Sequence, residues 1–214
     1  ADTDTLDRSR VRDRRPDRRV ARDQIGRRPR APGRIVDERQ RDLGAGATLH
    51  RLAQRVSLPA VVKPSRAGSA MGMSFVEREA DLPHAVMNAL SFSEAAIVER
   101  RIDGIEIAAS MLGSPDDTLP LVEVSPKSGV FAYAARYTAG ATDYHSPARL
   151  DADLTSTVHT VATQTFRALG QRDVSRADIL IDADGSPWVI DVNVSPGMTD
   201  TSLLPMAAQA AGIS

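Results

Sequence analysis

The chain has 214 residues, 42% of them hydrophobic, so it is long enough to bury a core in one or two domains. Its 27 basic and 28 acidic residues nearly cancel, which argues against a protein devoted wholly to nucleic-acid binding, and the absence of cysteine excludes disulfides and cysteine nucleophiles. No apolar run is long enough to span a membrane and no signal peptide is visible, so we expect a soluble, cytoplasmic protein.

Positive charge is concentrated near the N-terminus. Residues 1–55 contain 16 Arg, no Lys and nine acidic residues, a net charge of +7, so the rest of the chain carries −8. Residues 1–33 have no aromatic and few large apolar side chains, too few to offset the entropy lost on ordering. We expect a disordered or nonnative segment there, followed by a linker or partial domain start over 34–55. A basic arm that binds nucleic acid is the less favoured alternative, because no aromatic residue is interleaved with the charges.

From residue 56 onward, short apolar runs predict strands and stretches with apolar residues at helical spacing predict helices. Asp151 can cap the longest helix and Gly170 can end it. Residues 126–148, rich in Tyr, Gly, Ser and Pro, are expected to form a loop. The expected strands are 59–63, 74–76, 95–99, 106–112, 119–124, 175–182 and 187–193, and the expected helices are 79–90, 151–169 and 201–211. The pattern indicates an α+β fold with a mainly antiparallel sheet.

One predicted hairpin builds a candidate metal site. The Asp-Gly pair at 184–185 lies between two apolar runs and predicts a two-residue turn, which places Asp178 opposite Asp191 and Arg176 opposite Asn193. Residues two apart in a strand share a face, so these four side chains converge. Opposed carboxylates repel unless a cation lies between them, and oxygen ligands of this kind suit Mg²⁺. The adjacent arginine suits a phosphate; an exposed hairpin face with ordinary charges is the alternative.

Weaker signals come from four other places. Lys63 ends a strand and precedes the small-residue loop 65–73, whose backbone N–H groups could approach an anion. The spacing matches neither Walker A nor GxGxxG, so a flexible hairpin tip is the alternative. Glu99 and Glu106 could accept hydrogen bonds from adenine or ribose. Gly197 follows the metal strand and could offer its N–H to an oxyanion.

In chain order these segments resemble the D-alanine–D-alanine ligase family of the ATP-grasp superfamily. The matching stretches are VVKPSRAGSAMGMS, VERRIDGIE, ARYTAGAT, RADILID and DVNVSPGMTDTSLLPMA. The resemblance covers about residues 56–214 and implies an ATP-grasp fold, with a central subdomain over 56–124 and a C-terminal catalytic subdomain over 125–214, truncated at its end. The family's N-terminal domain is expected to be missing.

The resemblance implies ATP-dependent ligation of two D-alanines for peptidoglycan precursors. In the family, the carboxylate of the first D-alanine attacks the γ-phosphate to give an acyl phosphate, and the amine of the second then displaces phosphate. The implied partners are therefore ATP and D-alanine. Neither a membrane nor nucleic acid is expected, and full-length members are homodimers through the missing domain.

Residues that match the family's nucleotide contacts take their roles from the resemblance. Lys63 would hold the ATP phosphates, and Ser69 and its neighbours would form a flap over them. Glu99 would face the adenine and Glu106 the ribose. Further nucleotide contacts are implied for Arg100, Ile102 and Arg136, the last of which replaces the lysine of most members.

The resemblance also implies the catalytic roles. Asp178, Asp191 and Asn193 would hold two Mg²⁺ ions, or Mn²⁺, with aspartate at 191 replacing the more usual glutamate. Arg176 would stabilise the transferring phosphate and the tetrahedral intermediate, and the N–H of Gly197 would contribute to the oxyanion site. Ser202 would bind the carboxylate of the second substrate, and Tyr137 would lie on a mobile loop over the site.

Two alternatives stay open from the sequence. The chain could be a noncatalytic ATP-binding remnant, or its parent enzyme could use another D-amino acid or a D-hydroxy acid as acceptor. Tyr137 favours dipeptide formation, since relatives that use D-lactate typically carry histidine there.

Overall fold

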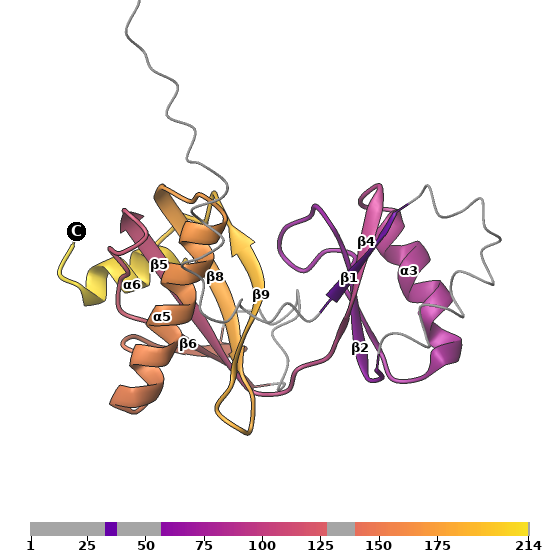
Figure 1. Ribbon diagram of the computed structural model, residues 1–214, viewed down its shortest axis with the longest axis horizontal. Coiled ribbons are helices and arrows are strands. Elements are labelled where there is room, and N and C mark those ends of the chain that lie inside the picture. Colours follow the sequence, from indigo (N-terminus) through magenta and orange to yellow (C-terminus); the bar gives the residue numbers. More distant parts are fainter. Residues whose placement is uncertain (1–32, 38–56, 128–139, 214) are drawn as a thin grey trace, which may run out of the picture.

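The computed structural model describes residues 33–37, 57–127 and 140–213. These residues form two sheets that lie side by side, and every strand pair within them is antiparallel (Figure 1). The expected α+β class and antiparallel pairing are therefore confirmed. Of the segment 1–33, expected to be disordered or nonnative, only Gly33 is described, and it lies in a strand. Most of the linker or partial domain start expected over 34–55 also lies outside the described residues.

The first sheet has the strand order β1-β4-β2-β3. Helix α3 (Leu82–Leu90), preceded by the 3₁₀ turn η2 (Glu79–Asp81), packs its buried face, including Val86, against this sheet. Strands β2 and β3 form the hairpin that the sequence predicts around the small-residue loop. The strands of this sheet are β1 (Gly33–Asp37), β2 (Ala60–Pro64), β3 (Ser74–Val76) and β4 (Ala95–Arg100).

The second sheet has the order β7-β6-β5-β8-β9 and a helix on each face. Alternate residues of its central strands face α5 (Ala152–Ala168) on one side and α6 (Leu203–Ala210) on the other. Strand β9 lies on the side of this sheet that faces the first sheet (Figure 1). The strands are β5 (Ile105–Gly113), β6 (Val122–Pro126), β7 (Thr142–His145), β8 (Asp173–Ile181) and β9 (Pro187–Asn193).

Helix α5 begins and ends as the sequence predicts. The side chain of Asp151 accepts a hydrogen bond from the backbone N–H of Leu154 at 2.8 Å, which satisfies one of the unpaired donors of the first turn. Gly170 follows the helix with a φ of +64°, a conformation that glycine adopts without steric cost. Phe166 and Val158 on its inner face are fully buried against β5 and β8.

The structure corrects two of the expected boundaries. Residues 142–145, expected within a loop, form strand β7, which pairs with β6 at the edge of the described sheet and has Thr142 as its buried residue. The strand expected from 119 begins at Val122 instead, after Pro120, which lacks the N–H that a ladder needs. The chain passes between the sheets at residues 101–104, so β5 and β6 share a sheet with β8 and β9.

An ion pair between the buried Glu123 and the exposed Arg149 ties the segment before α5 to β6. The Glu123 carboxylate, 6% exposed, accepts hydrogen bonds from the Arg149 Nη2, Nε and backbone N–H at 2.6, 3.1 and 3.1 Å. These bonds hold the pKa of Glu123 below its usual value, although burial acts against them. Because the folded-state pKa is depressed, the pair stabilises the fold above about pH 4.3 and loses this contribution as the pH falls through the folded pKa.

Replacing Arg149 with alanine is expected to destabilise the fold at pH 7, since the buried carboxylate loses its two side-chain donors. The loss should shrink as the pH is lowered from 7 to 4, because protonation relieves the unpaired charge. Urea unfolding of both proteins across this range measures it. A difference that stays constant with pH would contradict this account of the pair.

Among the described residues, no helix combines the length and the apolar character that crossing a membrane requires.

Candidate active site

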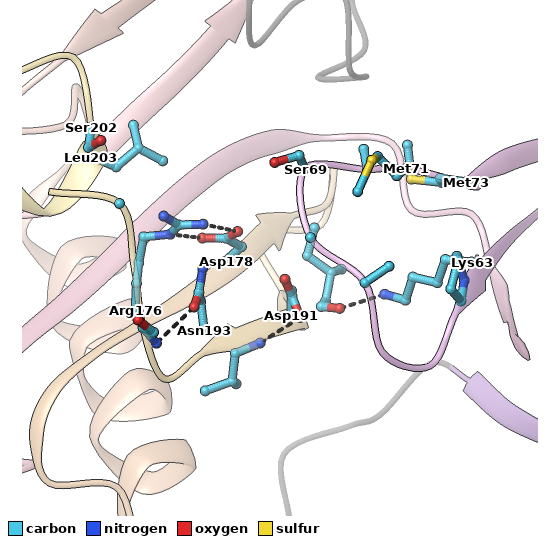
Figure 2. A pocket seen from close by; sticks show the side chains of 18 of the residues that line it. Lys63, Ser69, Met71, Met73, Arg176, Asp178, Asp191, Asn193, Ser202 and Leu203 are labelled. Atoms are coloured by element: carbon cyan, nitrogen blue, oxygen red, sulfur yellow. Dashed lines mark hydrogen bonds and ion pairs between the residues drawn. The ribbon is translucent and has the colours of Figure 1, made fainter. Parts of the chain in front are cut away.

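A cleft of about 950 Å³ lies between the two sheets and receives residues from both. Figure 2 shows Lys63, Ser69, Met71 and Met73 on the side of the first sheet, across from Arg176, Asp178, Asp191 and Asn193. The predicted site residues that line this cleft are Lys63, Ser69, Glu99, Arg176, Asp178, Asp191, Asn193, Gly197 and Ser202.

The β8–β9 hairpin brings four of these residues onto one face. Asp178 pairs with Asp191 and Arg176 pairs with Asn193, as the sequence predicts. The predicted two-residue turn is nevertheless wrong. The backbone N–H of Asp182 donates to the carbonyl of Ser186, so three residues connect the strands, and the last of them, Gly185, has a φ of +74°.

A β-bulge explains why the predicted pairs are still correct. The ladder shifts by one residue between Asp178 and Ile179, so that Ile190 is the extra residue of β9. This shift restores the register that the longer turn had displaced. The Ile190 carbonyl also accepts a hydrogen bond from Lys63 Nζ at 2.6 Å, so the bulge provides a contact between the two sheets.

Lys63 lies between this carbonyl and the carboxylate of Glu99, whose Oε1 is 2.7 Å from Nζ. Burial raises the pKa of Glu99 above its usual value, even though the Lys63 cation acts in the opposite direction. The ammonium is the nearest compensation for a carboxylate that is only 7% exposed. An anion entering the cleft would therefore meet a cation already held in place from two sides.

Arg176 and Asp178 form a buried, two-fold hydrogen-bonded pair. Nε donates to Oδ1 at 2.6 Å and Nη2 to Oδ2 at 2.9 Å, and both side chains are less than a tenth exposed. Burial alone would lower the pKa of Arg176, but Asp178, Asp191 and Glu106 raise it overall. A guanidinium has five N–H donors, and this pair uses two of them, which leaves donors for a phosphate.

Asp191 and Asn193 complete the acidic side of the cleft. Asp191 reaches solvent, yet the protein around it and the nearby Asp178 carboxylate raise its pKa above the usual value. Its Oδ1 accepts the backbone N–H of Val192, and Asn193 Oδ1 accepts that of Ser195, both at 2.9 Å. These bonds orient oxygen atoms that each keep a further lone pair.

The donor set fits Mg²⁺. Two carboxylates and an amide oxygen are the hard ligands that this ion takes alongside water and phosphate oxygens. Burial and, after it, repulsion from the Asp178 carboxylate raise the pKa of Asp191, and a cation would relieve this repulsion. In the described residues, no group of three or more His, Cys, Asp or Glu side chains is gathered closely enough to hold a metal by itself.

A tight turn forms the other wall of the cleft. Ser69 and Ala70 both have positive φ, 58° and 57°, and the N–H of Met71 donates to the carbonyl of Gly68 at 3.1 Å. Glycine and asparagine adopt this conformation most readily, so Ser69 and Ala70 each store about 1–2 kcal/mol of backbone strain. The strain is consistent with a loop shaped for a ligand.

The start of α6 forms the end of the cleft. Ser202 and Gly197 both line it, and a Cβ added at Gly197 would lie 2.8 Å from Ser202 Oγ. A side chain at position 197 would therefore push the Ser202 hydroxyl out of its present position. Two further hydroxyl residues of the same loop, Thr199 and Thr201, line the cleft but were missed in the sequence, as were Tyr144 and the carbonyl of Ile190.

Three predicted nucleotide contacts lie elsewhere. The guanidinium of Arg100 lies over the Trp188 ring, 4.8 Å from its centroid, and Ile102 is buried. Glu106 is outside the cleft lining, although its charge reaches Arg176. Arg136 and Tyr137 fall outside the described residues.

Comparison with known proteins agrees with this geometry. The family model described as "D-ala D-ala ligase C-terminus" matches residues 30–214. The D-alanine–D-alanine ligase of Pelotomaculum thermopropionicum is 42% identical over 168 residues, which are 78% of this chain and 53% of that protein. That of Nitrosomonas europaea is 39% identical over 172 residues, or 80% of this chain and 56% of the relative.

Solved structures show the same fold. The D-alanine–D-alanine ligase of Bacillus anthracis has a TM-score of 0.67 at 28% identity and covers 85% of this chain and 56% of its own. The VanG D-Ala:D-Ser ligase of Enterococcus faecalis has a TM-score of 0.71 at 28% identity and covers 86% and 53%. The chain thus spans about half the length of its relatives. It has the ATP-grasp fold of these ligases and belongs to the D-alanine–D-alanine ligase family, whose C-terminal portion it matches.

Proposed function

We propose that the protein joins two D-alanines with ATP and that this chain supplies the nucleotide, metal and acceptor sites of the reaction. The observation that carries the proposal is the cleft itself. A lysine from one sheet faces an arginine, two aspartates and an asparagine from the other, and a hydroxyl-rich loop lies at its end. Cations at the phosphates and oxygen ligands for a divalent ion are the parts that phosphoryl transfer needs.

ATP would lie between the two sheets. Lys63 supports the proposal because it is held in the cleft beside a bulged carbonyl, from which it can turn to a phosphate. The turn around Ser69 would cover the phosphates. A solved structure of the B. anthracis ligase, 27% identical with a TM-score of 0.68, is a complex with ATP, which agrees with this use of the cleft.

Mg²⁺ bound by Asp178, Asp191 and Asn193, as two ions or replaced by Mn²⁺, would neutralise the charge of the phosphates. The carboxylate of the first D-alanine would attack the γ-phosphate, releasing ADP and leaving an acyl phosphate. Arg176 is rigidly held by Asp178, so it could contact the transferring phosphate without losing its orientation.

The second step would take place toward helix α6. Ser202 would bind the carboxylate of the second D-alanine. The amine of this D-alanine would attack the carbonyl carbon of the acyl phosphate and expel phosphate. Arg176 and the N–H of Gly197 would stabilise the negative charge on the carbonyl oxygen as the tetrahedral centre forms. Tyr137 is proposed to lie over this site and to favour an amine acceptor.

Asp191→Asn tests the metal site without breaking a buried pair. The pKa of Asp191 is raised in the folded state, which means that its negative charge destabilises the fold at pH 7. Removing this charge should therefore leave the fold as stable as before or more stable. The same change removes a carboxylate ligand, and we expect Mg²⁺-dependent ATP binding to weaken at least 10-fold. Calorimetry and thermal unfolding of the same samples separate the two effects.

Asp184→Asn, at the exposed turn of the same hairpin, is the matched control and should change neither quantity. Unchanged Mg²⁺-dependent binding in Asp191→Asn would mean that the aspartate does not bind the ion, and the proposed metal site would be lost.

A further inference from the structure

We infer that Thr199 is a positioning residue, which holds the Ser202 hydroxyl so that its proton points at a bound carboxylate. The inference rests on the proposed function, in which Ser202 contacts the carboxylate of the second D-alanine. It adds a residue that orients this contact and gives the reason for the hydroxyl-rich composition of the loop.

Thr199 and Ser202 are joined by three hydrogen bonds. The backbone N–H of Thr199 donates to Ser202 Oγ at 3.2 Å, and the two hydroxyl oxygens lie 2.8 Å apart. The backbone N–H of Ser202 donates to the Thr199 carbonyl at 2.8 Å. Ser202 precedes α6 at the N-cap position, but its side chain makes no capping hydrogen bond and is turned back onto Thr199 instead. The Ser202 side chain is therefore held by its loop and not by its helix.

The direction of these bonds determines what Ser202 can recognise. A serine hydroxyl has two lone pairs and one proton. The backbone N–H of Thr199 donates to one lone pair of Ser202 Oγ. When the Thr199 hydroxyl donates to the other lone pair, Ser202 Oγ can accept no further hydrogen bond, and its own proton is free to be donated to a ligand in the cleft. Thr201 Oγ1 lies 3.4 Å from Thr199 Oγ1 and can donate into it in turn. A carboxylate, which only accepts, is the ligand that such a chain of donors favours.

The surroundings of the chain agree with an anionic ligand. Thr199, Thr201 and Ser202 all line the cleft, as does Leu203, the first residue of α6. The first N–H groups of a helix have no intrahelical partner, and here the N-cap side chain does not satisfy them. They add positive potential at the same end of the cleft. Gly197 leaves the space that Ser202 Oγ needs in this position.

Thr199→Val tests the inference, because valine is close to threonine in shape and replaces the hydroxyl with a methyl group that cannot form a hydrogen bond. The probe is D-alanine, titrated by NMR against the full chain with saturating Mg²⁺ and ADP. We expect the D-alanine affinity to fall about 10-fold in Thr199→Val and to stay within about threefold in Thr199→Ser, which restores the hydroxyl. Thr160→Val, on the exposed side of α5, is the matched control and should leave the affinity unchanged.

The ADP affinity and the melting temperature, read on the same samples, separate the possible failures. A loss of D-alanine binding with intact ADP binding and rescue by serine supports the inference. Wild-type affinity in Thr199→Val overturns it, as does a parent chain that binds ADP but no D-alanine, and both results leave the nucleotide site standing. A folded parent chain that binds neither molecule overturns the inference and the proposed function together.

Discussion

Replacing Lys63 with alanine is expected to weaken Mg²⁺-ATP binding on the order of 100-fold, the largest effect that a single side chain of the cleft should have. Two charges are involved. The variant lacks the cation that would contact the phosphates, and it leaves the buried Glu99 carboxylate without its partner at 2.7 Å. An unpaired carboxylate beside the phosphate position would repel the nucleotide. Calorimetric titration of the variant with Mg²⁺-ATP measures the combined effect.

Lys127 provides a matched control, because it is the only other lysine of the chain. Its side chain is 60% exposed, lies 3.7 Å from Asp143, and is not among the residues that line the cleft. Lys127→Ala should bind Mg²⁺-ATP as the parent does. The double variant Lys63→Ala with Glu99→Gln removes the unpaired charge and should recover stability without recovering affinity. Recovery of both would show that Lys63 serves only to neutralise Glu99.

Replacing Gly104 with alanine is expected to destabilise the protein by about 3 kcal/mol or more. Gly104 lies in the connection between the sheets, and its added Cβ would overlap the backbone carbonyl oxygen of Ile181 and lie 2.7 Å from the carbonyl carbon. Both atoms belong to the end of β8, so neither can rotate away as a side chain would. The connection would have to move away from the hairpin, and the cleft between the sheets would change with it. Thermal and urea unfolding measure the loss.

Gly68→Ala is the control for this prediction. An added Cβ at Gly68 meets nothing within 4 Å, and the backbone there has no positive φ. The substitution should be neutral or stabilise the fold by a few tenths of a kcal/mol by restricting the unfolded chain. Equal unfolding midpoints for Gly104→Ala and the parent would contradict the close packing between the connection and β8.

The four-residue patch of the hairpin could be predicted because an Asp-Gly pair lies between two apolar runs, which indicates a hairpin. The turn type could not, since it depends on Asp182, whose carboxylate accepts the N–H groups of Asp184 and Ser186 and the indole N–H of Trp188. The bulge at Ile190 was equally hidden, and its carbonyl meets a lysine from the other sheet. The two differences cancel in register, so the predicted pairs are correct although the turn is not.

The features that the sequence did not predict depend on tertiary structure more than on local sequence pattern. Strand β7 is short and polar and pairs on one side only, so it lacks the apolar alternation that indicates a strand. The role of Thr199 depends on where its hydroxyl points, which the spacing of residues 199 and 202 suggests only once the loop is known to line a cleft. Contacts such as that of Arg100 with Trp188 depend on tertiary packing, which local pattern does not encode.

The central claim is that the cleft between the sheets is a site for Mg²⁺-ATP, and calorimetric titration of the 214-residue chain with ATP tests it most directly. The titration is run once with Mg²⁺ and once with excess chelator. We predict one binding event per chain that is strongly weakened when the metal is removed, since the acidic side of the cleft then repels the phosphates. A chain that unfolds cooperatively but gives no binding heat with Mg²⁺ would contradict the claim.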